Sequence, residues 1–370
     1  MEAGLRNVKS LVVSAVNFSE GGPLTVLIES LDAAAEFLDD EWEIIALVQD
    51  VGLIKNPRVR CIEFPKSKRS WAIRLLLEWY RFAALSQQLQ PDLWFSLHDI
   101  TPRVQARRQV VYCHNPSPFY HVSWREAVLE PKFLLFNWFY KYLYRINIRR
   151  NYAVVVQQEW LRSEFYRLYE YPNIIVAHPA QQKSLNFSQK ASTSSKKIFL
   201  YPALPRVFKN IELLCQAATM LPEFMQAVIE IRLTIDGTEN RYACNLVRRY
   251  GGVKALRFIG RQSRDDMAKQ YAQCDAVLFP SKLETWGLPI TEAKALGKPL
   301  LVADLPYAYE TVGTYASVSF LPPNDAAAWA KVFEAVAAGK WVHLGNVDIT
   351  PSSPYATDWP QLWALLTEGL

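Results

Sequence analysis

The sequence predicts an α/β protein built from two tandem Rossmann-like domains, and three observations support this fold class. The chain has 370 residues, more than the ~250–300 residues at which a single hydrophobic core usually stops growing. Short apolar runs typical of buried strands alternate with longer amphipathic runs typical of helices. This alternation stops at one polar stretch near the middle of the chain and then begins again. Each half therefore predicts a parallel sheet covered by helices.

The first domain is expected over residues 1–180. An apolar run at 8–18 predicts a buried strand, and a glycine turn followed by an amphipathic run at 19–38 predicts the first helix. Apolar residues spaced three and four apart predict a long helix over 70–90. Further short apolar runs that end in polar loops predict strands at 42–50, 59–65, 92–97, 109–114, 152–158 and 173–179.

Residues 181–196 are polar, rich in Ser and Lys, and without periodicity, so they predict a linker. The alternation resumes over 197–350, the expected second domain, and residues 351–370 are expected to pack back on the first. A helix is predicted at 210–221, with strands at 197–204, 229–237, 253–260, 276–281, 298–304 and 318–323. Ligands of such sheets bind beyond the carboxyl ends of the strands, so a cleft between the domains is the expected site.

Composition narrows the class of protein. Half of the residues are hydrophobic and 21% are charged, which argues against a disordered or fibrous chain. Five scattered cysteines without a C-x-x-C pair argue against a disulfide framework or a structural zinc site. The first apolar run is too short for a signal peptide, and no stretch of about 18 uncharged apolar residues exists. We therefore expect a cytoplasmic protein.

The net charge of +5 is unevenly distributed. Residues 1–50 carry two Lys/Arg and ten Asp/Glu, whereas residues 51–150 carry seventeen and six. A basic region can serve an anionic membrane, nucleic acid or phosphorylated substrates, or it can be an ordinary solvated surface.

The stretch at 281–300 holds Glu284 and Glu292 with seven residues between them. A strand should end just before it, Glu284 should lie in the following loop, and Glu292 should lie on a helix that Pro289 opens and Gly297 ends. The amides of Gly287 and Leu288 would then form a helix start suited to an anion, with carboxylates beside it for hydroxyl groups. These features fit a sugar nucleotide; the alternative is a capped helix whose glutamates are solvated.

Residues 279–313, from "FPSKLETWGLPI" onward, resemble the signature of the family 4 retaining glycosyltransferases, which have the GT-B fold. The resemblance implies that Glu284 lies near the transferred sugar, that Glu292 holds the nucleotide ribose, and that the Gly287 and Leu288 amides contact sugar and phosphate. Trp286, which stands where phenylalanine is more usual, is likewise expected to contact the donor. Thr285 replaces the common glycine, which bears on the choice of donor sugar.

Two cations stand between the first strand and first helix of the second domain. Arg206 and Lys209 could neutralise a leaving diphosphate, or they could be ordinary surface cations. Lys209 matches the position of the lysine in the family, whereas Arg206 sits later than the family's arginine. The resemblance implies a diphosphate role for both.

Candidate site residues also close strands of the first domain. His114 ends the run at 109–114 and resembles the family's histidine that approaches the donor sugar; the alternative is a structural histidine. His98 and Asp99 end the preceding strand and are expected to line the acceptor side or to hold the loop.

Gly21 and Gly22 open the first predicted helix, where glycine lets backbone approach a phosphate closely. The resemblance implies that this loop abuts the donor diphosphate. The absence of G-x-G-x-x-G there argues against a dinucleotide oxidoreductase. The resemblance implies no obligatory metal, and the sequence agrees, since no D-x-D triplet stands at a strand end to hold a divalent ion. We therefore expect no metal and no cofactor, with the nucleotide sugar as donor substrate.

An aromatic and basic stretch is expected over 132–152. Lys141, Arg145 and Arg149 are four residues apart, which predicts one basic helical face among the aromatic residues Phe133, Phe136, Trp138, Phe139 and Tyr142. This pattern suits peripheral contact with an anionic membrane on its inner, cytoplasmic face. The alternative is a core helix with a basic solvent face. Nucleic acid fits poorly, since the opening of the chain is acidic and no binding motif occurs.

The sequence as a whole predicts a retaining hexosyltransferase that moves a hexose from a nucleotide-diphosphate sugar to a glycan or lipid-linked acceptor, as in bacterial surface polysaccharide synthesis. Two alternatives stay open. One is a GT-B relative with other chemistry, a sugar-nucleotide epimerase or a glycan phosphorylase. The other is a non-catalytic carbohydrate-binding relative.

Overall fold

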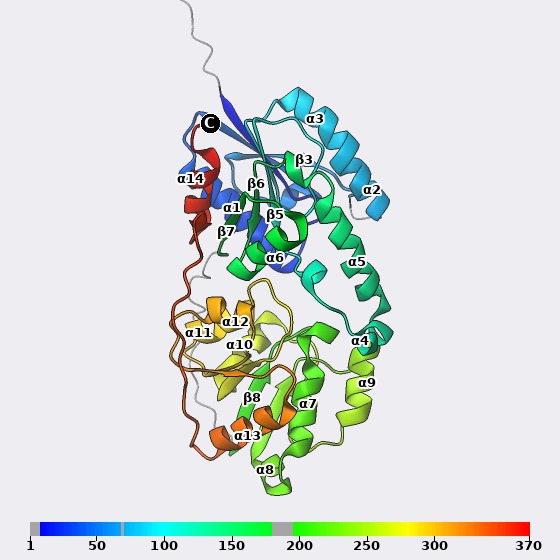
Figure 1. Ribbon diagram of the computed structural model, residues 1–370, viewed down its shortest axis with the longest axis vertical. Coiled ribbons are helices and arrows are strands. Elements are labelled where there is room, and N and C mark those ends of the chain that lie inside the picture. The colour runs from blue at the N-terminus through cyan, green and yellow to red at the C-terminus, as the bar shows by residue number, and fades with distance from the viewer. Residues whose placement is uncertain (1–7, 68–69, 180–194) are drawn as a thin grey trace, which may run out of the picture. The chain divides into compact units, whose positions relative to one another are not determined.

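The computed structural model describes residues 8–67, 70–179 and 195–370, and these contain two parallel sheets (Figure 1). The chain divides into two compact units. Unit 1 comprises Met1–Phe119, Trp138–Gln181 and Pro351–Leu370, and unit 2 comprises Tyr120–Asn137 and Gln182–Thr350. Each unit is a Rossmann-like α/β domain, so the predicted fold class is confirmed.

Unit 1 is built on a sheet of eight strands in the order β14-β7-β6-β5-β4-β1-β2-β3. All neighbouring strands run parallel. Its central strands are buried along their whole length, as expected when helices cover both faces of a parallel sheet. The strands are β1 Lys9–Ser14, β2 Trp42–Val48, β3 Val59–Glu63, β4 Leu93–Ser96, β5 Arg108–Cys113, β6 Ala153–Val156, β7 Ile174–Ala177 and β14 Tyr355–Ala356.

The helices predicted at 19–38 and 70–90 are present, the second with one internal difference, whereas α6 and α14 were not predicted. The long helix expected over 70–90 is α2, a π-helical turn at Leu77–Arg81 (η2) and α3, joined without a break. Ser70 begins it by accepting a hydrogen bond from the Ile73 amide. The helices are α1 Gly21–Phe37, α2 Trp71–Leu76, α3 Phe82–Leu89, α6 Glu159–Tyr169 and α14 Trp359–Thr367, with α5 Pro131–Arg145 divided between the two units.

The C-terminal segment belongs to unit 1. β14 adds to the edge of the sheet beside β7, and α14 lies along α1 (Figure 1). The Trp363 side chain is fully buried, and its Nε1 donates to the Ser30 carbonyl oxygen, 3.1 Å away. Its ring also packs edge-on against Phe95, with 5.1 Å between ring centroids. The segment therefore completes the hydrophobic core of unit 1.

Unit 2 holds a six-stranded parallel sheet in the order β10-β9-β8-β11-β12-β13. Its strands are β8 Lys197–Tyr201, β9 Ile229–Leu233, β10 Leu256–Phe258, β11 Ala276–Phe279, β12 Leu300–Ala303 and β13 Val318–Leu321. Its helices are α4 Trp124–Leu129, α7 Ile211–Met220, α8 Glu223–Val228, α9 Arg241–Tyr250, α10 Arg264–Gln273, α11 Leu288–Ala295, α12 Pro306–Val312 and α13 Ala326–Ala337.

The assignment of residues 120–137 differs from the expectation of a first domain that runs without interruption from 1 to 180. This stretch groups with unit 2 because its side chains bind there. Phe133 packs on Phe208 with 5.2 Å between ring centroids, and Glu126 Oε1 lies 3.3 Å from Lys282 Nζ. Most of the predicted linker at 181–196 lies outside the described residues.

Candidate functional site

Two predicted site residues meet at one edge of the sheet of unit 2. Lys209 follows β8 and Glu284 follows β11, and these strands are parallel neighbours. Because neighbouring parallel strands end at the same edge, the loops that follow them converge. Lys209 Nζ lies 2.5 Å from Glu284 Oε1, and the two side chains are only 19% and 12% exposed. The pair is therefore a partly buried, charge-assisted contact at the expected ligand edge.

The backbone around Lys209 is held by residues that sequence reasoning did not single out. Asn210 has a left-handed backbone (φ 58°), a conformation that asparagine tolerates well. Its Nδ2 donates to the carbonyl oxygens of Pro280 and Pro323 at 3.1 and 2.8 Å. The Tyr201 hydroxyl donates to the Lys209 carbonyl oxygen at 2.8 Å. The only sequence signal for this arrangement was the Lys-Asn pair itself.

The start of α11 has the geometry that an anion site requires. Gly287 is the residue before the helix, and its φ of 86° is one that side-chain-bearing residues rarely adopt. The space is also tight, because an added Cβ would lie 3.1 Å from Phe279 Cε1 and that ring would have to shift slightly. Leu288 is the first helical residue, and no side chain caps the first amides. Pro289 has no N–H, and the Ile290 N–H donates to the Gly287 carbonyl oxygen at 2.9 Å. The N–H groups that this turn offers to a phosphate or sugar oxygen are therefore those of Gly287 and Leu288.

The Trp286 side chain has a structural position. It is only 9% exposed, its Nε1 donates to Thr291 Oγ1 at 3.0 Å, and its carbonyl oxygen accepts from Thr311 Oγ1. The indole thus fixes the loop that carries Gly287. Its predicted contact with the donor stays a prediction.

Glu292 lies on α11 and is mostly buried. The Tyr271 hydroxyl donates to its Oε2 at 2.5 Å. Burial raises the pKa of Glu292 above its ordinary value, and the Tyr271 hydrogen bond and the Arg264 charge only partly oppose this. The carboxylate is thus oriented by a protein group, and its predicted contact with ribose stays a prediction.

The structure pairs Arg206 with a residue other than those of the predicted site. Arg206 Nε lies 3.2 Å from Glu130 Oε2, and its guanidinium lies over the rings of Phe133 and Phe208. Lys282 has a similar partner in Glu126, which also accepts from the Tyr120 hydroxyl at 2.7 Å. Sequence reasoning missed both carboxylates. Their four-residue spacing in an otherwise basic stretch was the available signal.

In unit 1 the structure brings His98, Asp99 and His114 together. Asp99 is 5% exposed and has a φ of 69°. Its Oδ1 accepts from the backbone N–H groups of His114 and Asn115 at 2.8 and 3.1 Å, and from the Tyr144 hydroxyl at 2.9 Å. Asp99 therefore holds the loop that carries His114, which is one of its two predicted roles.

The His114 side chain remains 24% exposed, and its Nε2 lies 3.7 Å from Asp99 Oδ2. Burial lowers the pKa of His114 below its ordinary value. The Asp99 carboxylate opposes this shift, whereas His98 and Arg74 act with it. The imidazole is thus biased toward its neutral form. Its predicted approach to a donor sugar stays a prediction.

Two buried residues that contact His98, Arg74 and Glu78, were not singled out from the sequence. His98 is 1% exposed; its Nε2 lies 3.1 Å from Ser14 Oγ, and its Nδ1 lies 2.9 Å from Glu78 Oε1. Arg74 donates to the His98 carbonyl oxygen at 2.5 Å. Arg74 and Glu78 are four apart in the run 70–90, which read only as an amphipathic helix. His98 and Asp99 are both buried, and their predicted contact with an acceptor stays a prediction.

Gly21 and Gly22 stand where the sequence places them, at the start of α1. Gly21 has a φ of 66°, both residues are exposed, and no side chain caps the first amides. The N–H groups of this turn are thus open, as a phosphate contact would require. That contact stays a prediction.

Over 8–67, 70–179 and 195–370, no group of three or more His, Cys, Asp or Glu side chains is arranged to hold a metal ion. In the same ranges, no helix combines the length and the apolar character needed to cross a bilayer.

Comparison with known proteins places this site in a family context. Residues 182–342 match the family model described as "Glycosyl transferases group 1". The chain is 27% identical over 210 residues to O-antigen chain mannosyltransferase B of Escherichia coli, covering 52% of this chain and 54% of that protein. The chain thus spans about half the length of this curated relative, and about a third or less of the others that match.

Solved structures extend the likeness in fold to nearly the whole chain. A glycosyltransferase from Rickettsia africae superimposes with a TM-score of 0.62 at 14% identity, covering 90% of this chain and 89% of that one. Anabaena HepE in complex with UDP-glucose gives a TM-score of 0.56 at 15% identity, covering 90% of each chain. The two-unit fold is therefore GT-B, as the sequence predicts. The segment that matches the group 1 glycosyltransferase model, residues 182–342, carries Lys209, Glu284, Gly287 and Glu292.

Proposed function

We propose that the protein is a retaining hexosyltransferase that moves a hexose from a nucleotide-diphosphate sugar to a glycan or lipid-linked acceptor. One observation carries the proposal. The Lys209–Glu284 pair lies at the carboxyl ends of β8 and β11, in the segment that matches the family model. A buried cation suits a diphosphate, and a carboxylate beside it suits a sugar carbon that becomes positive.

Each site residue of unit 2 then has a separate role. Lys209 and the first amides of α11 hold the negative charge of the diphosphate, and Arg206 adds a second cation when it exchanges Glu130 for the ligand. Glu292 accepts hydrogen bonds from the ribose, as its orientation by Tyr271 favours. Glu284 orients the hexose and stabilises the developing positive charge; it is not a covalent nucleophile.

The transfer step needs no further reagent. The bond between the anomeric carbon and the diphosphate oxygen breaks, and the electron pair leaves with the diphosphate. The acceptor hydroxyl oxygen forms a bond to the same face of that carbon, which preserves the anomeric configuration. Its proton passes to the departing phosphate oxygen. Lys209 and the α11 amides lower the barrier because they stabilise charge on the leaving group.

The relatives support the donor and acceptor classes. Anabaena HepE was crystallised with UDP-glucose, and the Escherichia coli relative bears the name of an O-antigen chain mannosyltransferase. A nucleotide sugar as donor and a bacterial surface glycan as acceptor are therefore our proposal for this chain. No cofactor is part of it.

The experiment is a transfer assay with a panel of UDP-, GDP- and dTDP-hexoses, each incubated with and without glycan acceptors. We expect one donor class to give acceptor-dependent glycoside with retained anomeric configuration. Lys254→Ala is the matched control for Lys209→Ala, since Lys254 is also an ion-paired lysine of unit 2 but is 64% exposed. An isomerised donor without acceptor would instead support an epimerase, and binding without turnover a carbohydrate-binding protein.

We propose in addition that α5 contacts an anionic membrane. Three large side chains on one face of this helix are exposed: Leu135 at 66%, Trp138 at 61% and Tyr142 at 51%. Their spacing of three and four residues aligns them along the helix. The opposite face, with Phe133, Tyr140, Leu143 and Tyr144, is buried.

The charge of α5 favours a bilayer with anionic lipids. Pro131–Arg145 contains Lys132, Lys141 and Arg145 and no Asp or Glu. The predicted basic stripe needs one correction, because α5 ends at Arg145 and Asn147 turns the chain with a φ of 61°. Arg149 lies beyond this turn, in a short 3-10 helix, and does not continue the face.

Co-sedimentation with phosphatidylglycerol vesicles tests this contact. Trp138→Ala with Tyr142→Ala should release the protein, whereas the exposed α6 residue in the control Tyr166→Ala should not matter. Lys141→Gln with Arg145→Gln should weaken binding more at low than at physiological salt, because the Debye length falls from about 30 Å at 0.01 M to about 8 Å at 0.15 M. A wild-type protein that stays in the supernatant at low salt would refute the contact.

A further inference from the structure

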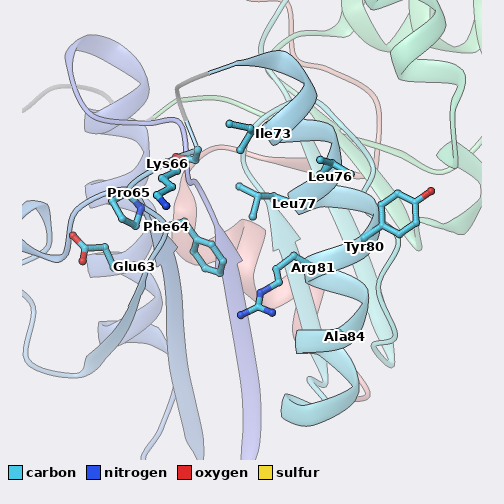
Figure 2. A pocket seen from close by; sticks show the side chains of 11 residues that line it. Glu63, Phe64, Pro65, Lys66, Ile73, Leu76, Leu77, Tyr80, Arg81 and Ala84 are labelled. Atoms are coloured by element: carbon cyan, nitrogen blue, oxygen red, sulfur yellow. The ribbon is translucent and has the colours of Figure 1, made fainter.

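Unit 1 contains an apolar groove that the donor site does not use (Figure 2). It has a volume of about 670 Å³ and lies between the loop that follows β3 and the helical run α2–η2–α3. Pockets for small ligands usually have volumes of ~300–1,000 Å³. The groove is thus large enough for an organic ligand.

The groove is lined mainly by hydrocarbon. Phe64, Ile73 and Leu77 form its sides, and Leu76 and Tyr80 stand at its rim with exposures of 56% and 67%. Such a lining offers few partners to the hydroxyl groups of a sugar. An apolar chain is therefore the better match.

The loop side of the groove is well fixed. The Phe64 ring packs edge-on against the buried Phe82, with 5.5 Å between ring centroids. Ser67 Oγ donates to the Val16 carbonyl oxygen at 2.5 Å, and the Ser67 amide donates to the Phe64 carbonyl oxygen at 3.1 Å. The groove is a built feature, since these contacts hold its wall to the core of unit 1.

Two cations complete the lining. Lys66 and Arg81 are exposed, and their side chains extend toward Phe64 in Figure 2. Among the described residues, no carboxylate forms an ion pair with either. Glu63 also lines the groove, but in Figure 2 its carboxylate points away from Leu77 and Arg81. The groove therefore combines an apolar channel with positive charge that no protein anion neutralises.

The π-helical turn at Leu77–Arg81 contributes to this arrangement. It supplies Leu77, Tyr80 and Arg81 to the groove, while Glu78 from the same turn points into the protein to contact His98. A π-helical turn widens a helix by one residue and often occurs at functional sites.

We propose that this groove binds a lipid phosphate, namely the hydrocarbon chain and phosphate head of a lipid-linked acceptor. The chain lies against Phe64, Ile73 and Leu77, and the phosphate binds Lys66 and Arg81. This proposal rests on the proposed transferase function and narrows its acceptor to the lipid-linked class. Charge complementarity favours a phosphate head over a neutral lipid.

The α2 helix, which contributes Ile73 and Leu76 to the groove, also contacts α5. Trp71 of α2 packs edge-on against Phe139 and Tyr140 of α5, with centroid distances of 5.7 and 5.6 Å. The helix that forms one side of the groove is thus in contact with the helix proposed to lie on the membrane. A lipid acceptor could therefore pass from the bilayer to the groove.

Binding of farnesyl phosphate to the full chain, measured by calorimetry below its aggregation concentration, tests the proposal. Farnesol lacks the phosphate and inorganic phosphate lacks the chain, so both should bind at least about tenfold more weakly. Arg81→Gln with Lys66→Gln should weaken farnesyl phosphate binding by about tenfold or more, because both charge-assisted contacts to the phosphate are lost. Lys55→Gln, an exposed lysine outside the groove, should leave it unchanged.

A second variant fills the groove itself. Ala84 lines it from α3 and is exposed, so Ala84→Trp should block the channel and lower the affinity for farnesyl phosphate at least tenfold. Gln87→Trp, on the exposed surface of the same helix, is the matched control. Nucleoside diphosphate affinity, which depends on unit 2, should be retained by Ala84→Trp and reports that the chain is folded.

The outcomes separate this proposal from the transferase proposal. Transfer to a glycan without farnesyl phosphate binding overturns the groove and leaves the transferase standing. Farnesyl phosphate binding without any transfer would support the groove and overturn the transferase proposal. Equal competition by phosphatidylglycerol vesicles would mean a general phospholipid site and would overturn the acceptor assignment. Unchanged binding in Ala84→Trp would place the ligand elsewhere.

Discussion

Replacing Gly287 by alanine should perturb both the stability and the donor site of unit 2. Gly287 precedes α11 with a φ of 86°, and α11 is the helix whose first amides are assigned to the donor. A Cβ at this position would lie 3.1 Å from Phe279 Cε1 and 3.3 Å from Ile290 Cδ1. Both the backbone conformation and the surrounding space therefore oppose the substitution.

The two effects can be estimated separately. A left-handed backbone is less favourable by roughly 1–2 kcal/mol for a residue that carries a Cβ. Overpacking of a filled site destabilises by typically ~1–3 kcal/mol. We therefore expect Gly287→Ala to lower the free energy of unfolding by about 2–5 kcal/mol, which corresponds to a Tm decrease of at least about 4 °C for a domain of this size.

Two other glycines of unit 2 provide matched controls. Gly297 has a φ of 64° but no atom within 4 Å of an added Cβ, so Gly297→Ala should show the backbone effect alone. Gly252 has neither restriction, so Gly252→Ala should be neutral or slightly stabilising. Urea unfolding gives the free energy of unfolding of all three variants. The difference between Gly287→Ala and Gly297→Ala then isolates the cost of the close contacts of the added Cβ.

The same variants test the assignment of the α11 amides. A displaced helix start should weaken UDP binding in calorimetry by about tenfold or more for Gly287→Ala, with no comparable loss for Gly297→Ala. The reasoning is refuted if Gly287→Ala is as stable as Gly297→Ala. A destabilised Gly287→Ala variant that keeps wild-type affinity for every nucleoside diphosphate tested would instead remove the α11 amides from the donor site.

Three further predictions concern individual side chains. Lys209→Ala should lower donor turnover by on the order of 100-fold, the typical loss when one transition-state charge partner is removed, while the fold survives; unchanged turnover would exclude Lys209 from the diphosphate site. Glu292→Ala should weaken calorimetric binding of the free nucleoside diphosphate, whereas Glu284→Ala should mainly slow transfer. If Glu284→Ala loses nucleotide affinity and Glu292→Ala does not, the roles of the two glutamates are reversed. Because burial lowers the pKa of His114, the unfolded chain binds the proton more tightly. Stability from this group is thus complete above pH ~6.5 and is lost as the pH falls from there toward the folded pKa. His114→Gln should lose less stability than wild type between pH 7.5 and 5.5 in urea unfolding, and equal losses would show that His114 does not titrate differently on folding.

The sequence by itself determined the fold class and singled out Lys209 and Glu284 as site residues. Strands and helices could be located because burial imposes a spacing that is visible in the chain, and alternating elements imply parallel sheets. The structure brings Lys209 and Glu284 together because both lie in segments that follow neighbouring parallel strands, β8 and β11, whose carboxyl ends share one edge of a sheet. The Gly287 turn could be anticipated, because few residues other than glycine adopt its backbone conformation.

Only the tertiary structure decided what each side chain packs against. The pattern of α5 marked it as apolar and basic, but a spacing of three and four residues does not distinguish a face buried in protein from one exposed as Trp138 and Tyr142 are. Arg206 and Glu130 are 76 residues apart, so their contact depends on how residues 120–137 pack in unit 2. The Lys66 and Arg81 groove depends likewise on a loop and a helix meeting across the fold. Local sequence encodes which residues avoid water; long-range packing determines their partners.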